Sequence, residues 1–208
     1  ILGRATIAWV DYVTQDADFD KETLSAVRLG FSEQLVSSFT GGSYLNYQDF
    51  DSEMGMKVPS IQVRQLVVEP YPLLLFLRKN FILTIHPLSV DRRFTRLRRY
   101  AEAFIRKIPT DALPQDKLTI LLMRILDHNN DRNFEHLRQI EERGDELNET
   151  MTDPYTPRSK LGPEIYHMKH ALITYLNALW NTVDVLHALR YGDAELITDD
   201  PKLLDKLG

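Results

Sequence analysis

A glutamate and two histidines lie three residues apart in the C-terminal half of the chain. Glu164, His167 and His170 fall within about a third of the circumference of a helix, so a carboxylate and two imidazoles could reach one transition-metal ion. Their order is not the His-Glu-x-x-His arrangement of zinc hydrolases. Adventitious metal binding is therefore a better interpretation than a designed metal site. A metal-dependent hydrolase that uses these three residues is the least favoured of our functional hypotheses.

Two further polar clusters lie on expected helices, at residues 127–131 and 141–153. The second is rich in glutamate and aspartate and would attract divalent cations weakly, although a solvated helix face explains it equally well. The first, Asp-His-Asn-Asn-Asp, superficially resembles a cation loop but lacks the glycine and terminal glutamate of an EF-hand. We expect it to be a polar segment in the middle of a helix.

Five arginines lie within two turns of one expected helix: Arg92, Arg93, Arg96, Arg98 and Arg99. Binding of phosphate or nucleic acid is one interpretation. A solvated cationic face is the better one, because no aromatic stacking platform accompanies the arginines and the opposite face is a hydrophobic stripe. The formal net charge of -5 also argues against a nucleic-acid partner.

The sequence lacks the motifs of common catalytic sites. It has no glycine-rich phosphate loop, no Gly-x-Ser-x-Gly elbow and no cysteine, which excludes a cysteine nucleophile, thiolate metal sites and disulfides. His86, at the end of an expected strand, could act as a general base, but nothing nearby in the sequence suggests its substrate. We do not expect an enzyme, and we predict no catalytic residue.

The composition is ordinary for a globular protein, with 43% hydrophobic and 26% charged residues among 208. No apolar run approaches the ~20 residues of a membrane span, and the N-terminus has no signal-peptide pattern. We therefore expect this chain to be soluble. It starts at Ile1 and stops at Gly208, soon after Pro201 opens another helix, so we also expect it to be part of a longer protein.

The first 110 residues alternate between strand and helix patterns. Strands are expected at residues 5–13, 44–50, 56–65, 65–77 and 81–86. Asn80 suits a hairpin turn before the last strand, and Pro70 with Pro72 indicates an edge strand or a bulge. Helices follow the first strand and the last one, so we predict a mixed α/β head.

A long helical pattern runs from Pro163 to Tyr191. Steps of three and four residues separate its apolar positions, which are Ile165, Met168, Leu172, Tyr175, Leu179, Thr182, Leu186 and Leu189. A preceding helix, expected from about Gln115 to Met151, repeats these steps at Leu137, Ile140, Gly144, Leu147 and Met151. Residues 153–157 cannot continue a helix, so we predict a protruding antiparallel hairpin.

The order of these parts resembles the N-terminal cytoplasmic domain of CorA-type magnesium channels over nearly the whole chain. The stretches that carry the resemblance are Ala8-Trp9-Val10-Asp11, Leu29-Gly30-Phe31-Ser32-Glu33, residues 79–86, and Trp180 followed by Val185-Leu186 in the second hairpin helix. The Gly-Met-Asn motif of that family is not in the sequence. The resemblance therefore rests on the domain alone, and the related zinc transporter branch has a similar domain.

The resemblance implies a homopentameric channel for Mg2+, with Co2+ or another divalent cation as further cargo. Its cytoplasmic funnel would bind Mg2+ between subunits and close when intracellular Mg2+ is plentiful. The regulatory sites of the family pair a carboxylate near the sheet with one on the stalk helix of the neighbour. In this chain the candidates near the sheet are Asp49, Asp51 and Glu53.

We therefore predict an α/β (α+β) fold in which a mixed sheet flanked by helices, at residues 1–110, is followed by a helical hairpin at 111–198. Residues 199–208 would begin a stalk helix that leads to membrane helices outside this chain. The predicted function is divalent-cation sensing at the cytoplasmic face of the cell membrane. The alternatives are the cytoplasmic domain of a zinc transporter and a soluble module whose hairpin packs on a partner helix.

Overall fold

A mixed sheet of five strands forms the centre of the head. The computed structural model describes residues 6–15, 19–40, 44–192 and 194–207, and its strands follow the order β1-β5-β4-β3-β2. They are β1 (Ala8–Thr14), β2 (Tyr47–Asp49), β3 (Glu53–Arg64), β4 (Val67–Arg78) and β5 (Phe81–Pro87). β1 pairs with β5 in parallel and the other pairs are antiparallel, which confirms the predicted fold class. Residue 5 of the first expected strand and Gly208 lie outside the described residues.

Tight turns join β3 to β4 and β4 to β5. Gln65 and Asn80 adopt positive φ angles of 58° and 65°, as the left-handed positions of such turns require. Pro70 and Pro72 lie in the half of β4 that pairs only with β3, because β5 pairs with residues 74–78 alone. Their missing N–H groups therefore interrupt no ladder on the open side. The expectation of an edge strand holds for this half, whereas the other half is central.

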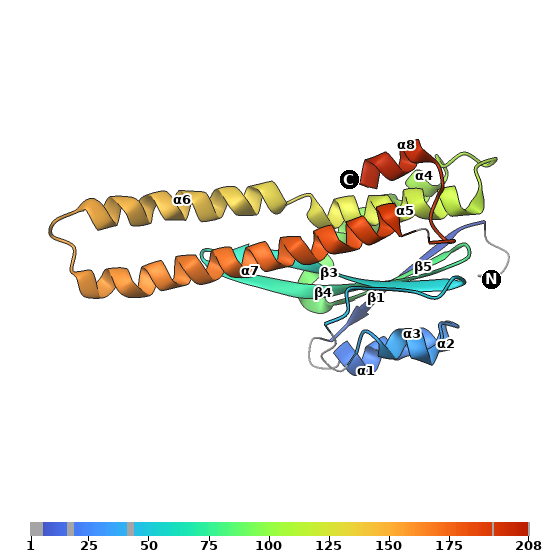
Figure 1. The fold of residues 1–208 in the computed structure, drawn as a ribbon, viewed down its shortest axis with the longest axis horizontal. Helices are drawn as coiled ribbons and strands as arrows, with labels where there is room; N and C mark the ends of the chain where they lie inside the picture. Colours follow the sequence, from blue (N-terminus) through green and yellow to red (C-terminus); the bar gives the residue numbers. More distant parts are fainter. Residues whose placement is uncertain (1–5, 16–18, 41–43, 193, 208) are drawn as a thin grey trace.

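Helices cover both faces of the sheet (Figure 1). One face carries the short helices α1 (Phe19–Thr23), α2 (Ser25–Arg28) and α3 (Glu33–Ser37), and the other carries α4 (Asp91–Ile105), α5 (Pro114–Asn130) and α7 (Arg158–Tyr191). The C-terminal half of β4 is buried on both sides, since Leu73, Leu75 and Leu77 face the second group while Leu74 and Phe76 face the first. This two-sided burial explains why residues 73–77 are continuously apolar.

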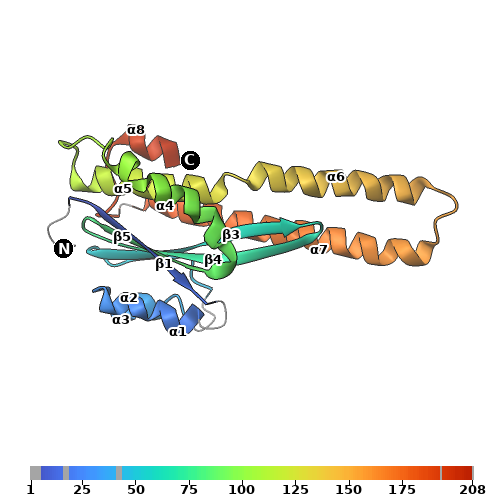
Figure 2. The ribbon, with the colours of Figure 1, turned by 180° about the vertical axis from the view of Figure 1, so that it is seen from behind.

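The C-terminal segment returns to the second helical layer. A 3-10 turn, η3 (Leu88–Val90), leads from β5 into α4, which lies beside α5 when the molecule is seen from behind (Figure 2). α8 (Pro201–Leu204) and η4 (Asp205–Leu207) close the same core, where Leu207 is buried. Asp200 caps α8, because its side chain accepts a hydrogen bond from the backbone N–H of Lys202.

The helix expected from Gln115 to Met151 is wrong as a single element. α5 ends at Asn130 and α6 (Asn133–Thr152) begins after a break. The polar segment at residues 127–131 lies at the end of α5 and not in the middle of a helix: Asp127 and Asp131 are exposed, whereas Asn129 is 1% exposed and donates a 2.9 Å hydrogen bond to the carbonyl of Pro59. Bonds from this segment to the sheet and to α4 therefore hold the end of α5 at the point where the helix breaks.

α6 and α7 form the expected antiparallel hairpin, which extends beyond the head together with the β3–β4 ribbon (Figure 1). α7 starts at Arg158 and contains Pro163. Tyr175 of α7 shares a small core with Ile61 of β3 and Ile140 of α6. The division into a head domain and a hairpin domain stays a prediction, because this core belongs to both. Among the described residues, no helix combines the length and the apolar character needed to cross a membrane.

Candidate functional site

The structure does not assemble Glu164, His167 and His170 into a metal-binding group. Both histidines are exposed in the outer half of α7, and Oε2 of Glu164 lies 3.7 Å from Nη2 of Arg143 on α6. Tyr166 lies beside the histidines, with ring centroids 5.9 Å from His167 and 6.2 Å from His170. Within the described ranges, no three histidine, aspartate or glutamate side chains are arranged to hold a metal ion. A metal site formed by Glu164, His167 and His170 stays a prediction.

Asp51 and Glu53 lie at the turn between β2 and β3 in different environments. Both carboxylate oxygens of Glu53 accept hydrogen bonds from the backbone N–H of Ser32, at 3.0 and 3.2 Å. The Oγ of Ser32 in turn accepts a bond from the N–H of Leu35, so Glu53 helps to hold the start of α3. Asp51 is exposed and has a φ of 55°, a conformation that aspartate tolerates better than most residues. Glu53 is therefore already engaged in the fold, whereas Asp51 faces solvent.

Asp49, at the end of β2, has an oxygen that the fold leaves unsatisfied. Its Oδ1 is buried without a hydrogen-bond partner among the described residues, and the same holds for Oη of Tyr47 two residues earlier. Burial raises the pKa of Asp49, and hydrogen bonds from the backbone of Asp51 and Phe50 offset this effect only in part, because the charge of Asp51 raises the pKa further. Burial and the charge of Asp49 together raise the pKa of Tyr47 to about 12. Of the three predicted carboxylates, Asp49 is the one with a buried, unpaired oxygen and a raised pKa, so it would gain most from a bound cation.

A buried polar network that the sequence did not reveal joins β1, β5 and α4. Asp11 lies on β1, and its two carboxylate oxygens are 3.2 and 3.3 Å from Nε2 of His86. Oγ1 of Thr84 donates to the same carboxylate at 2.5 Å, and Nη1 of Arg98 donates at 2.5 Å. The ring of His86 is fully buried and stacks on Phe94 of α4, with centroids 4.4 Å apart. The network therefore ties α4 to the edge of the sheet.

The electrostatics of this network favour the charged form of Asp11. Burial alone would raise the pKa of Asp11, but the hydrogen bonds and charges of His86, Thr84 and Arg98 outweigh it and hold the pKa below its ordinary value. Nδ1 of His86 lies 3.2 Å from the carbonyl oxygen of Pro87. Both ring nitrogens of His86 therefore have oxygen neighbours within the network. No reaction centre is evident, because the network is closed on itself, and we interpret it as structural.

Two of the five arginines do not belong to a solvated face, which corrects that expectation. Arg93 is half-buried and donates to the carbonyls of Ile61 and Asn129, the latter at 2.9 Å. Burial lowers its pKa. Arg98 is paired with Asp11 and, at 2.7 Å, with Asp91. Only the remaining three arginines are exposed: Arg92, Arg96 and Arg99.

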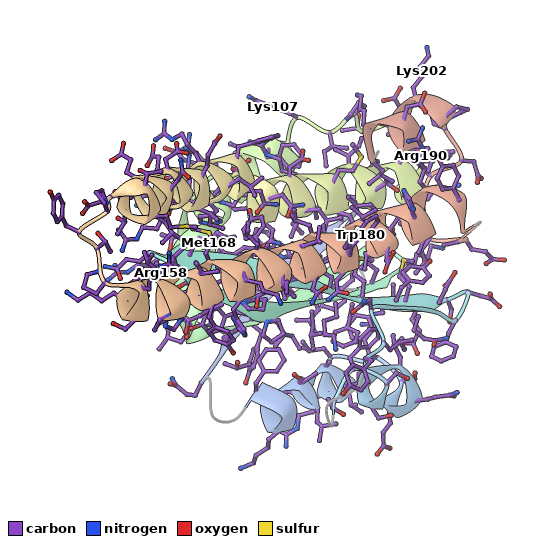
Figure 3. All side chains as sticks on the ribbon, turned by 60° about the vertical axis from the view of Figure 1, so that its left-hand side comes forward. Lys107, Arg158, Met168, Trp180, Arg190 and Lys202 are labelled. Atoms are coloured by element: carbon purple, nitrogen blue, oxygen red, sulfur yellow. The ribbon has the colours of Figure 1, made fainter. Side chains whose placement is uncertain are left out.

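Ion pairs engage several carboxylates of the acidic hairpin. Nε of Arg138 lies 3.4 Å from Oε1 of Glu142, and Arg143 pairs with Glu146. A shallow cavity of about 400 Å3 lies between α6 and the β3–β4 turn, and its lining includes Gln65, Gln139 and Arg143 beside these glutamates. Because both signs of charge line the cavity, it is not an evident anion or cation site. Figure 3 shows α7 running across the molecule below α6, with Arg158 near its start.

Comparison with protein families decides the assignment. The model of the family described as CorA-like Mg2+ transporter protein matches residues 4–207. The chain belongs to this family. The recognition of an N-terminal soluble domain of a CorA-type transporter is thereby confirmed, and the match covers the sheet, the hairpin and α8.

Solved structures agree with the CorA fold. The chain aligns over 99% of its length with 78% of the soluble domain of CorA from Methanocaldococcus jannaschii, at 17% identity and a TM-score of 0.68. Against the complete CorA magnesium transporter of the same organism it aligns over 97% of its length at 17% identity, with a TM-score of 0.66, and spans 60% of that chain. The ZntB cytoplasmic domain from Vibrio parahaemolyticus aligns over 96% of this chain and 78% of its own, at 16% identity and a TM-score of 0.65. No curated protein sequence matches the chain.

Proposed function

We propose that this chain is the cytoplasmic regulatory domain of a CorA-like channel for Mg2+ and Co2+, and that it senses divalent cations. The match of the family model over residues 4–207 carries the proposal, and the likeness to the soluble domain of CorA supports it. The work of the domain is binding and conformational change, not catalysis. In the full-length protein we expect a homopentamer held in the membrane by helices that follow this domain.

The physical basis is the repulsion between acidic surfaces at a subunit interface. A divalent cation between two such surfaces offsets their repulsion, and the attraction is strong where water is partly excluded. If the cation binds only when the surfaces are close together, it shifts the population towards that closed state. Equal affinity for both states would shift nothing, so sensing requires a site that is complete only in one arrangement.

Asp49 is the best candidate in this chain for the carboxylate that contributes to such a site. Its buried Oδ1 has no hydrogen-bond partner among the described residues, and its raised pKa reports that its charge is poorly solvated. A cation supplied with further oxygen ligands by a neighbouring subunit would stabilise that charge. Asp51, exposed at the same turn, could add a second ligand, whereas Glu53 is occupied by the N–H of Ser32.

Limited proteolysis of the full-length protein during titration with Mg2+, Co2+ and Zn2+ tests the proposal. Closure around the cation should slow cleavage at millimolar Mg2+, because closed subunits expose less backbone to the protease. Asp49→Asn should shift this protection to higher Mg2+ concentrations. Asp111→Asn, an exposed loop substitution that changes the net charge equally, is the matched control and should leave the titration unchanged. Equal protection of the two variants would remove Asp49 from the sensor.

A zinc transporter is the second candidate, because the ZntB cytoplasmic domain has a similar fold. The same titration separates the two, since protection by Zn2+ alone, at concentrations where Mg2+ has no effect, would favour it. In that case His167 and His170 become the first residues to replace, because imidazole prefers zinc to magnesium. Cleavage that no cation changes would favour the third hypothesis, a module whose hairpin packs on a partner helix.

A further inference from the structure

α7 carries an apolar stripe on the side turned away from the sheet. Tyr166, Ile173, Leu176 and Trp180 are between 48% and 63% exposed. At 100° per residue they fall within about 80° of arc, nearly opposite Tyr175 and its contacts with α6 and the sheet. Figure 3 shows α7 at the surface of the molecule, with Trp180 labelled along it.

α6 also exposes an aromatic side chain. Phe134, near the start of α6, is 87% exposed. The carbonyl of Asn133, the residue before it, accepts a 2.9 Å hydrogen bond from Oη of Tyr175, which holds the start of α6 against the buried side of α7. Monomeric proteins rarely leave a contiguous apolar surface of this kind uncovered, and such surfaces mark interaction sites.

Charges at the two ends of the stripe indicate what covers it. Lys169 and Asp184 are exposed on this side of α7, and in the described part of the chain neither has an ion-pair partner. They are equally far along the helix from the point between residues 176 and 177. Ile173 and Trp180 are also equally far from that point. The stripe is therefore complementary to itself when it is turned end over end.

We propose that this stripe is an interface with a second copy of the chain, in which two α7 helices pack antiparallel around a two-fold axis beside Leu176. Lys169 of each copy then faces Asp184 of the other, and Ile173 of each packs on Trp180 of the other. A parallel pair would instead bring like charges together at both ends. Electrostatic complementarity thus selects the antiparallel orientation.

The expected dimer is weak. Covering these side chains removes roughly 500 Å2 of surface per copy, compared with about 800 Å2 in a standard interface. The contact is isologous, so it is distinct from the contacts of a five-fold ring, which are heterologous. It would join two free domains or domains of separate rings. The inference therefore does not rest on the proposed cation sensing and can fail independently of it.

Cysteine cross-linking tests the orientation directly, because the natural chain contains no cysteine. Under mild oxidation the 208-residue Leu176→Cys variant should form a disulfide-linked dimer much faster than Tyr155→Cys, a control at the hairpin tip that is more exposed than Leu176. A mixture of Lys169→Cys and Asp184→Cys chains should yield mainly the mixed dimer. Predominant linkage of Lys169→Cys chains to each other would overturn the antiparallel geometry.

Charge reversal provides a second readout that needs no new disulfide. In sedimentation velocity over a concentration series, Lys169→Glu should weaken dimerisation at least tenfold, and Lys169→Glu combined with Asp184→Lys should restore it. These surface substitutions leave the core intact, and circular dichroism checks that the variants fold. A wild-type chain that stays monomeric at every concentration, with Leu176→Cys no more reactive than Tyr155→Cys, would overturn the proposal. So would protection of the thiol in the Leu176→Cys variant by another segment of the full-length protein.

Discussion

The part of α7 that lies on the sheet and the part that extends beyond it follow the same residue spacing but differ in burial. Tyr175, Thr182 and Leu189 are buried, whereas Ile165 is 43% exposed. The spacing establishes that the helix has an apolar side. Only the presence of β3, β4 and α5 opposite that side decides whether it is buried. We therefore expect most of the stability to reside in the head and the root of the hairpin.

The largest effect is expected where α4 meets the sheet. Phe94→Ala should lower the free energy of unfolding by about 3–5 kcal/mol, because it opens a cavity beside the buried ring of His86. Tyr155→Ala at the exposed hairpin tip should change it by less than about 0.5 kcal/mol. Urea unfolding followed by circular dichroism measures both. A loss at Tyr155 comparable to that at Phe94 would contradict the division between a stable head and a dispensable tip.

A smaller loss is expected at the buried network. Asp11→Asn should destabilise the fold by about 2 kcal/mol, because it removes charged hydrogen bonds to His86 and Arg98. The pKa of Asp11 is lowered in the folded protein, so this stability is present above the unfolded pKa of about 3.9 and is lost as the pH falls through the folded pKa. The variant should therefore lose less stability than the wild type on acidification below pH 4. An unchanged acid profile would show that the network does not hold Asp11 ionised.

The sheet was predictable because its signals are local. Asn80 marks the last hairpin turn, and the strand boundaries differ from the expected ones by only a few residues. The network was not predictable, because its members meet through the parallel register of β1 and β5. Asp11 lies opposite Thr84, and Val13 lies opposite His86, which no local pattern reports. Arg98 looked like one more solvated cation for the same reason.

The hairpin was predictable in outline and less so in detail. Proline and aspartate at residues 153–157 marked its tip, and the three- and four-residue steps marked its helices. The break after Asn130 escaped notice, because it depends on tertiary hydrogen bonds from Asn129 to Pro59 and from Arg93 to Asn129. Among the candidate ligands, only Asp49 has a buried oxygen without a partner in the described chain, and that property belongs to the folded state.

Asp49 also lies in the head, but we expect its replacement to stabilise the fold, unlike the replacements of Phe94 and Asp11. Its pKa is raised in the folded protein, so between the unfolded and folded pKa values rising pH lowers stability, and above both values the cost is constant. Asp49→Asn should therefore stabilise the isolated chain at pH 7, by only about 0.5 kcal/mol because the residue is partly solvated. Thermal unfolding at pH 4 and pH 7 measures this. Destabilisation at pH 7 would mean that the backbone hydrogen bonds of the carboxylate outweigh the cost of its burial, which would make Asp49 a poor sensor candidate.

The smallest effect is expected in the outer half of the hairpin. Glu164→Gln removes the charge that lies 3.7 Å from Arg143, between side chains that are both nearly half exposed. Solvent screening and side-chain entropy leave such pairs worth at most about 0.3 kcal/mol, and added salt should reduce even this. Thermal unfolding of Glu164→Gln should therefore match the wild type within about 1 °C at high salt. A loss of several degrees would show that α6 and α7 depend on this contact, and the outer half would then be a cooperative part of the head rather than an arm extending from it.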